Sequence, residues 1–143
     1  VDAYRKAQVP FHLTTRQFME IAHLMTDDRG IVVSNVISAA DGPRSRFARS
    51  QSRTMGSVFN SVRYYPTRNT SLVQNIELLA SKPDGMTEKE LLESNVRYDR
   101  KNLSEEIDDH FEPDTDDVPL LEDDYAPVDR LLDPLVGQKY VLE

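Results

Sequence analysis

The stretch from Gly30 to Ser38, with the sequence GIVVSNVIS, restricts the fold of this chain more than any other. Its apolar residues are Ile31, Val32, Val33, Val36 and Ile37. They lack the alternation of apolar and polar residues that marks a half-exposed strand. A near-continuous apolar run of this length is typical of a strand that is covered on both faces of a parallel sheet. We therefore expect an α/β fold with this strand at its centre.

The polar pair Ser34–Asn35 interrupts the apolar run toward its carboxyl end. In open α/β sheets, ligands bind in the crevice outside the carboxyl ends of the strands. A buried Asn side chain needs hydrogen-bond partners for its amide group. Asn35 therefore either pairs with neighbouring backbone or faces a ligand, and the sequence leaves both open.

A helix is expected before this strand. Thr14 is followed three residues later by Gln17, which is the capping-box pattern of a helix start. Phe18, Ile21, Ala22 and Met25 then recur at helical spacing as one apolar stripe. With Val1–Ala3 as the end of an earlier strand, these elements predict a βαβ unit.

A second helix and a hairpin are expected after it. Asp41-Gly42-Pro43 opens the helix, because Pro is tolerated in a first helical turn. Its predicted buried side holds Phe47, Ala48, Gln51, Met55 and Val58. Residues 61–67 and 74–81 have strand composition, and the turn-like residues 68–71 between them predict an antiparallel hairpin at one edge of the sheet.

The remainder of the chain is expected to form an acidic helical tail. We place the main unit at residues 1–82 and the tail at 83–143. Thr87-x-x-Glu90 is a second capping box, and helical spacing continues within 91–111. Residues 118–132 carry too many apolar side chains for a solvated tail, so we expect them to dock on the main unit.

Charge is divided unevenly between these two parts. Residues 1–82 hold 11 Lys and Arg against 6 Asp and Glu, whereas residues 83–143 hold 6 against 19. Arg46, Arg49 and Arg53 share one face of the second helix and could bind phosphate or nucleic acid. The acidic total of −8 and the lack of interleaved aromatic residues favour a solvated face or a seat for the acidic tail. No nucleic-acid partner is expected.

The sequence lacks the residues that metal sites and membrane spans require. The chain has no cysteine, and its three histidines lack ligand-like spacing, so we expect no metal site. No apolar run approaches the length of a membrane span, which predicts a cytoplasmic protein and leaves open a membrane segment upstream. Val1-Asp2-Ala3 reads as the end of a strand already under way, so we expect a carboxyl-terminal piece of a longer polypeptide.

Two groups of residues resemble the spermidine synthase-like (polyamine aminopropyltransferase-like) branch of the class I S-adenosylmethionine-dependent methyltransferase fold. The first is Val1-Asp2-Ala3 followed by Pro10-x-His12-Leu13-Thr14-Thr15-x-x-Phe18. The second is Gln74-Asn75-Ile76 together with Leu121-x-Asp123-Asp124-Tyr125-Ala126-Pro127-Val128-Asp129, the most specific of these motifs. The resemblance covers about residues 1–82 and 118–132. It implies the carboxyl-terminal half of a Rossmann-like fold, βαβαββ, whose last strands are an antiparallel hairpin.

The resemblance also implies an activity and a set of site residues. Asp2 matches the family's general base, which takes a proton from an amine that attacks decarboxylated S-adenosylmethionine. Tyr4, His12, Asn35, Asp123 and Asp124 are the candidate substrate-binding residues. Each has a structural alternative: Asp2 is an ordinary strand-end carboxylate and Tyr4 covers the sheet. His12 is a loop hydrogen-bonder, and the two aspartates form a helix cap or turn. The expected partners are a small-molecule amine and the missing N-terminal half of the enzyme, and homodimerisation stays open.

Three departures keep other functions open. The family's second acidic residue is missing from the matching stretch Ala3-Tyr4-Arg5-Lys6, which holds two cations instead. These cations would repel a cationic amine substrate. The family's Tyr-Pro-Ser-Gly in the hairpin is replaced by Thr67-Arg68-Asn69-Thr70. The Gly-rich nucleoside-binding half is also missing. The alternatives are a methyltransferase that uses S-adenosylmethionine itself and a non-catalytic binding or dimerisation module.

Overall fold

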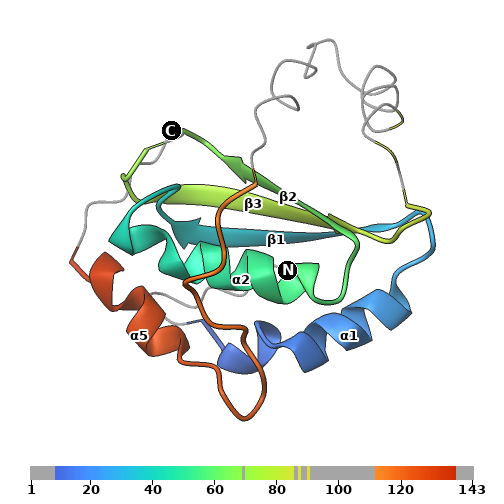
Figure 1. Cartoon of the computed structure of the whole chain (residues 1–143), viewed down its shortest axis with the longest axis horizontal. Helices are drawn as coiled ribbons and strands as arrows, with labels where there is room; N and C mark the ends of the chain where they lie inside the picture. The colour runs from blue at the N-terminus through green and yellow to red at the C-terminus, as the bar shows by residue number, and fades with distance from the viewer. Residues whose placement is uncertain (1–8, 69, 86, 88–89, 91–111, 138–143) are drawn as a thin grey trace.

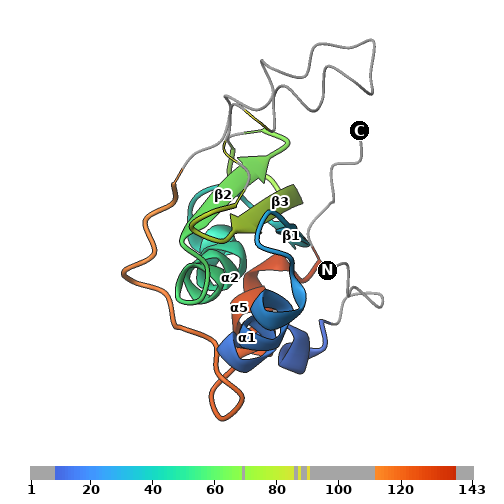
Figure 2. The same ribbon diagram turned by 90° about the vertical axis from the view of Figure 1, so that its right-hand side faces the viewer.

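The computed structural model describes residues 9–68, 70–85, 87, 90 and 112–137. The first half of these residues forms η1 (Phe11–Leu13), α1 (Arg16–Met25), β1 (Ile31–Ser38), η2 (Pro43–Ser45) and α2 (Arg46–Gly56). The second half forms β2 (Ser61–Pro66), β3 (Gln74–Ser81), α5 (Val128–Leu132) and η3 (Asp133–Leu135). The fold is mixed α/β, and α1, α2 and α5 all lie on one face of the sheet (Figures 1 and 2).

The sheet of the described residues has three strands in the order β1-β3-β2, and both neighbouring pairs are antiparallel. β2 and β3 form the predicted hairpin, with Tyr64 opposite Leu78. The described neighbour of β1 is β3, and the two strands pair antiparallel with Val36 opposite Ile76. The expectation of parallel pairing is therefore wrong for this pair, and the central strand of the three is β3.

β1 is also not covered on both faces. Val32 and Val36 face the helices and are buried, whereas Ile31 and Val33 face the other way and are 38% and 37% exposed. Side chains alternate across a strand, and β-branched residues suit a half-exposed sheet surface as well as a core. The β-branched residues therefore have a high strand propensity on both faces of β1, but only the face toward the helices is fully buried.

The start of α1 is built differently from the capping box that the sequence indicates. The N-cap is Thr15, whose hydroxyl accepts a hydrogen bond from the Phe18 backbone N–H at 3.3 Å. Thr14 instead donates its hydroxyl proton to the carbonyl oxygen of Phe11 at 2.6 Å, within the turn of η1. Because η1 uses Thr14, the helix begins one residue later than the sequence pattern predicts.

The buried side of α1 also differs from the predicted stripe. Met19 is fully buried, and Phe18 and Ala22 pack partly against the core, but Ile21 and Met25 are 60% and 83% exposed. The helix therefore contacts the body along a narrower face than its apolar residues allow. β1 is reached through a turn in which the Gly30 N–H donates to the Asp27 carbonyl at 2.9 Å.

α2 follows the prediction closely. Gly42, with a φ of 69°, precedes Pro43 in η2, which continues directly into α2. The left-handed backbone at Gly42 suits a residue without a Cβ atom. Four of the predicted inner residues are buried, namely Phe47, Ala48, Gln51 and Met55. The fifth, Val58, is partly buried.

The segment after residue 112 packs on the body, and its buried residues belong to the same core as the sheet and helices. Leu121, Val128 and Leu131 are 0%, 2% and 5% exposed. The Leu121 N–H donates to the hydroxyl oxygen of Thr54 at 3.0 Å, and this bond is buried. Apolar residues of the segment 118–132 are thus buried in the common core, and the division of the chain at residue 82 stays a prediction.

The described part of the second capping box has the expected hydrogen bonds. The Thr87 N–H donates to the Glu90 carboxylate at 2.9 Å, and the Glu90 N–H donates to the Thr87 hydroxyl at 3.2 Å. The helical segments expected within 91–111 lie outside the described residues, as does the strand expected at residues 1–3. In the described part of the chain, no helix has the length and hydropathy of a membrane span.

Candidate functional site

The turn of residues 122–125 lies against the first turn of α1. The backbone N–H groups of Glu122 and Tyr125 each donate to the other residue's carbonyl oxygen, at 3.1 and 2.9 Å, and close the turn. The Arg16 N–H donates to the Leu121 carbonyl at 2.8 Å. The Asp123 N–H donates to the side-chain oxygen of Gln17 at 3.1 Å. These bonds join two segments that are more than 100 positions apart in the chain.

An ion pair adds to this attachment. The guanidinium of Arg16 lies 2.8 Å from the carboxylate of Glu122 and 3.9 Å from that of Glu20. Both partners are partly exposed, so we expect the pair itself to contribute little to stability. It nevertheless places a cation beside the acidic turn, and the N-terminal end of α1 contributes a partial positive charge there.

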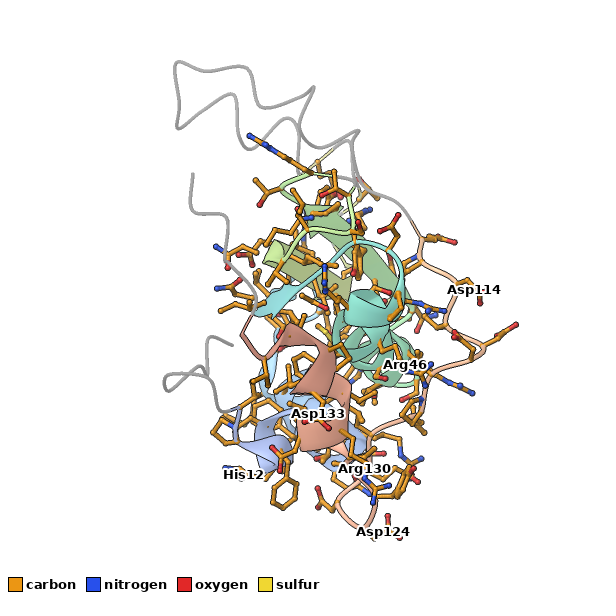
Figure 3. All side chains as sticks on the ribbon, turned by 90° about the vertical axis from the view of Figure 1, so that its left-hand side faces the viewer. His12, Arg46, Asp114, Asp124, Arg130 and Asp133 are labelled. Atoms are coloured by element: carbon orange, nitrogen blue, oxygen red, sulfur yellow. The ribbon has the colours of Figure 1, made fainter. Side chains whose placement is uncertain are left out.

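Asp123 and Asp124 are exposed at the tip of this turn. His12 is exposed in η1, directly before α1, and its ring makes an edge contact with Phe11 at a centroid distance of 5.8 Å. Figure 3 shows His12 and Asp124 toward the same end of the molecule. The structure thus brings three of the candidate substrate-binding residues to the region around the start of α1.

Asn35 lies elsewhere. It lies two residues after the half-exposed Val33 on β1 and shares its face, so its side chain is on the sheet face away from α1 and α2. Its side-chain oxygen is buried without a hydrogen-bond partner among the described residues. The sheet lies between the Asn35 side chain and the helices, and the acidic turn is attached to α1, so the two do not form one site. Asp2 and Tyr4 lie outside the described residues, and their roles stay predictions.

Described residues line a hollow near each end of α2. One, of about 460 Å³, lies just beyond the carboxyl end of β1 and is lined by Asp41, Pro43, Arg44, Ser71 and Pro134. The other, of about 520 Å³, lies at the C-terminal end of α2, where residues 112–120 form its outer wall. The first hollow occupies the position where open α/β sheets usually bind ligands. Within the described ranges, no three His, Asp or Glu side chains converge as metal ligands.

Among the residues that the structure describes, Tyr64 and Glu90 have shifted pKa values. Burial raises the pKa of the Tyr64 hydroxyl, and nearby Arg49 opposes this shift. The backbone N–H and hydroxyl of Thr87 lower the pKa of Glu90, and the guanidinium of Arg29, 2.7 Å away, lowers it further. Neither residue lies in the acidic turn. These shifts bear on stability and do not identify a catalytic group.

Sequence reasoning missed Gln17 as a contact for the acidic turn. Gln17 fits the third position of a capping box, but its side-chain oxygen accepts a bond from Asp123 instead of returning to the helix start. The signal in the sequence was indirect: Asp123 belongs to the tail motif, and Gln17 lies at an unspecified position within the Pro10-to-Phe18 motif. No protein-family model, curated protein or solved structure matches this chain.

Proposed function

We propose that this chain supplies the general base and part of the acceptor pocket of a spermidine synthase-like transferase. In this reaction an amine nitrogen attacks the carbon of the aminopropyl group next to the sulfonium of decarboxylated S-adenosylmethionine. The carbon–sulfur bond breaks, its electron pair stays on sulfur, and methylthioadenosine leaves. Asp2 accepts the proton that the amine must lose. An amine is nucleophilic only when deprotonated, which is why a carboxylate base serves this step.

One observation supports the proposal: the segment that contains the Pro10-to-Phe18 motif lies against the tail motif, through Arg16 and Gln17 at its two unspecified positions. Arg16, Gln17 and their neighbours belong to the segment around the start of α1, and Leu121–Asp123 belong to the tail motif. A chance likeness in two unrelated segments would not require them to meet. Since Leu121 and Val128 are also buried in the core, the tail motif is part of the folded unit.

The order of the described elements further supports the proposal. The order along the chain is helix α1, strand β1, helix α2 and the β2–β3 hairpin. This is the order of elements expected for the carboxyl-terminal half of a Rossmann-like fold of this kind. Because β1 and β2 both run antiparallel to β3, they run parallel to each other. The hollow beyond the carboxyl end of β1 has the position of a ligand crevice in such folds.

Within this proposal the acceptor pocket draws on Tyr4, His12, Asp123 and Asp124, and Asn35 contacts a different part of the substrate or pairs structurally. The carboxylates would attract and orient a cationic amine. The nucleoside half of the co-substrate needs a Gly-rich segment that this sequence does not contain, so a further segment or chain would complete the enzyme.

A methyltransferase is the second candidate, and Arg5 and Lys6 favour it. Two cations three and four positions after Asp2 in the sequence would disfavour a polyamine and suit an acceptor with negative charge. In that case S-adenosylmethionine itself would be the co-substrate. A non-catalytic binding module is the third candidate.

The test uses the complete native polypeptide with a panel of di- and polyamines and either form of the co-substrate. Product masses are then measured. An aminopropyl increment would support the proposal and identify the acceptor. A methyl increment would replace it with the second candidate, and the absence of transfer under both conditions would favour the third.

Replacing the general base gives the sharper test. We expect Asp2→Asn to reduce kcat about a hundredfold or more, because general-base catalysis typically contributes that much. The matched control is Asp84→Asn, which changes an exposed carboxylate in the turn after β3 and should leave kcat unchanged. Full activity of Asp2→Asn would remove Asp2 from the mechanism.

A further inference from the structure

Three arginines form a row along the outer face of α2. Arg46, Arg49 and Arg53 are spaced by three and four residues, which places them on one side of a helix. The segment 112–117, here called the strap, runs alongside α2 in both ribbon views (Figures 1 and 2). Figure 3 shows Arg46 and Asp114 on the same side of the molecule.

The row holds the strap mainly by its backbone. Arg49 donates to the Asp114 carbonyl at 2.5 Å, and Arg53 donates to the Thr115 carbonyl at 3.2 Å. Arg46 donates to the Asp117 carbonyl at 3.2 Å. Among the described contacts, Asp117 is the strap residue whose carboxylate pairs with the row. It binds Arg49 and lies 3.6 Å from the guanidinium of Arg46.

The strap is held differently at its downstream end. Val118 is 2% exposed, and its carbonyl accepts a hydrogen bond from Arg53 at 2.5 Å. Leu121 is fully buried and is bonded to Thr54 and to the start of α1. Buried apolar contacts therefore fix residues 118–121. Exposed hydrogen bonds and ion pairs, which contribute less and are screened by salt, hold the strap itself.

A hollow lies under the strap. The 520 Å³ hollow at the end of α2 has Phe59, Asn60 and Val62 on the body side and Glu112, Pro113 and Thr115 on the strap side. Phe59 is 2% exposed and Val62 is partly buried. The hollow is partly open to solvent in the closed state, and movement of the strap away from α2, with Val118 as the hinge, would expose its body side further, Val62 included.

We propose that the arginine row is a binding site for multivalent phosphate anions, which is occupied by the strap and opens when such an anion displaces it. A guanidinium binds phosphoryl oxygens more strongly than neutral peptide carbonyls, because the hydrogen bonds are charge-assisted and bidentate. The strap competes because it is tethered, which gives it an effective concentration on the order of millimolar. This inference is independent of the transferase proposal.

The charges of the strap couple anion binding to its opening. The strap carries four carboxylates, at Glu112, Asp114, Asp116 and Asp117, close to the row. These groups repel an approaching anion while the strap is closed, and the repulsion falls when the strap moves away. An anion therefore binds the open state more tightly, and this difference in affinity is what shifts a conformational equilibrium.

The chain contains no cysteine, so one introduced thiol can report the opening. We would alkylate Val62→Cys in the full chain with a neutral maleimide, in tripolyphosphate and in sodium chloride at equal ionic strength. The expected result is a rate at least about fivefold higher in tripolyphosphate, the lower end of typical coupling between two sites. Leu24→Cys, at a position of α1 that is 81% exposed and lines neither hollow, should react at the same rate in both salts.

Arginine variants in the Val62→Cys background identify the site. Arg49→Gln should raise the rate without the anion and remove the response to it. Arg130→Gln, an exposed position on α5, should keep the response. Equal rates in the two salts would show screening alone and overturn the proposal, and so would a response that survives Arg49→Gln or is lost in Arg130→Gln. If Arg49→Gln does not fold, Arg46→Gln takes its place, because Arg46 also donates to the strap backbone at Asp117.

Discussion

Tyr64 shows at the scale of one residue how burial sets a chemical property. It is fully buried in β2, and its hydroxyl donates to the Ala39 carbonyl at 3.3 Å. Ionised phenolate is disfavoured where water is excluded, so burial raises the pKa of Tyr64 above the value of about 10 that it has in an unfolded chain.

This shift makes stability fall in alkali. Below pH 10 the Tyr64 hydroxyl is protonated in both states, and the shift costs no stability. Above pH 10 the unfolded chain loses the proton and the folded chain retains it, so the free energy of unfolding decreases as pH rises. We expect urea titrations between pH 8 and pH 11 to show a smaller decrease for Tyr64→Phe than for the native chain. Tyr125→Phe, at an exposed position, is the control, and an unchanged slope for Tyr64→Phe would contradict the assignment.

At the scale of one element, α1 depends on its N-cap. The hydroxyl of Thr15 satisfies an N–H group in the first turn that has no partner within the helix. Loss of an N-cap side chain typically costs about 1 kcal/mol. We therefore expect Thr15→Ala to lower the free energy of unfolding by about that amount.

The conservative variant separates capping from packing. Thr15→Ser keeps a hydroxyl that can accept from Phe18, so it should recover most of the loss in Thr15→Ala. Urea denaturation followed by far-ultraviolet circular dichroism measures both. Equal losses in the two variants would mean that Thr15 acts through its methyl group, since the residue is also fully buried.

At the scale of the whole molecule, the segment after residue 112 completes the core. Leu121 is fully buried and connects α2 to the start of α1 through its two backbone hydrogen bonds. We expect Leu121→Ala to cost about 2 to 5 kcal/mol, the usual range for truncating a buried leucine. Leu72→Ala, at a position 49% exposed, should cost much less.

The shape of the unfolding transition tests the same idea. If the tail segment and the sheet share one core, unfolding monitored by different probes should follow one transition, which Leu121→Ala shifts as a whole. Separate transitions for the tail and the sheet, or a loss in Leu121→Ala no larger than in Leu72→Ala, would show that the tail is an independent attachment.

Several features of this protein could be determined from the sequence because they depend on nearby residues. The β2–β3 hairpin follows from two strand-like segments with a short turn between them, and the start of η2 and α2 follows from Gly42 and Pro43. The capping box of Thr87 and Glu90 needs residues only three positions apart. The docking of residues 118–132 was predictable from composition, since so many apolar side chains would not remain in water.

Other features were decided only by the tertiary structure. The antiparallel pairing of β1 with β3 depends on where the chain returns, and apolar composition is the same for either direction. The contact between Gln17 and Asp123 joins residues 106 positions apart, and no local spacing encodes it. The exposure of Ile21 and Met25 depends on how α1 is placed on the body. Local propensities act over a few residues, whereas burial and long-range hydrogen bonds depend on the path of the whole chain. The acidic turn lies beside α1 because that path brings residues 122–125 back to the helix start.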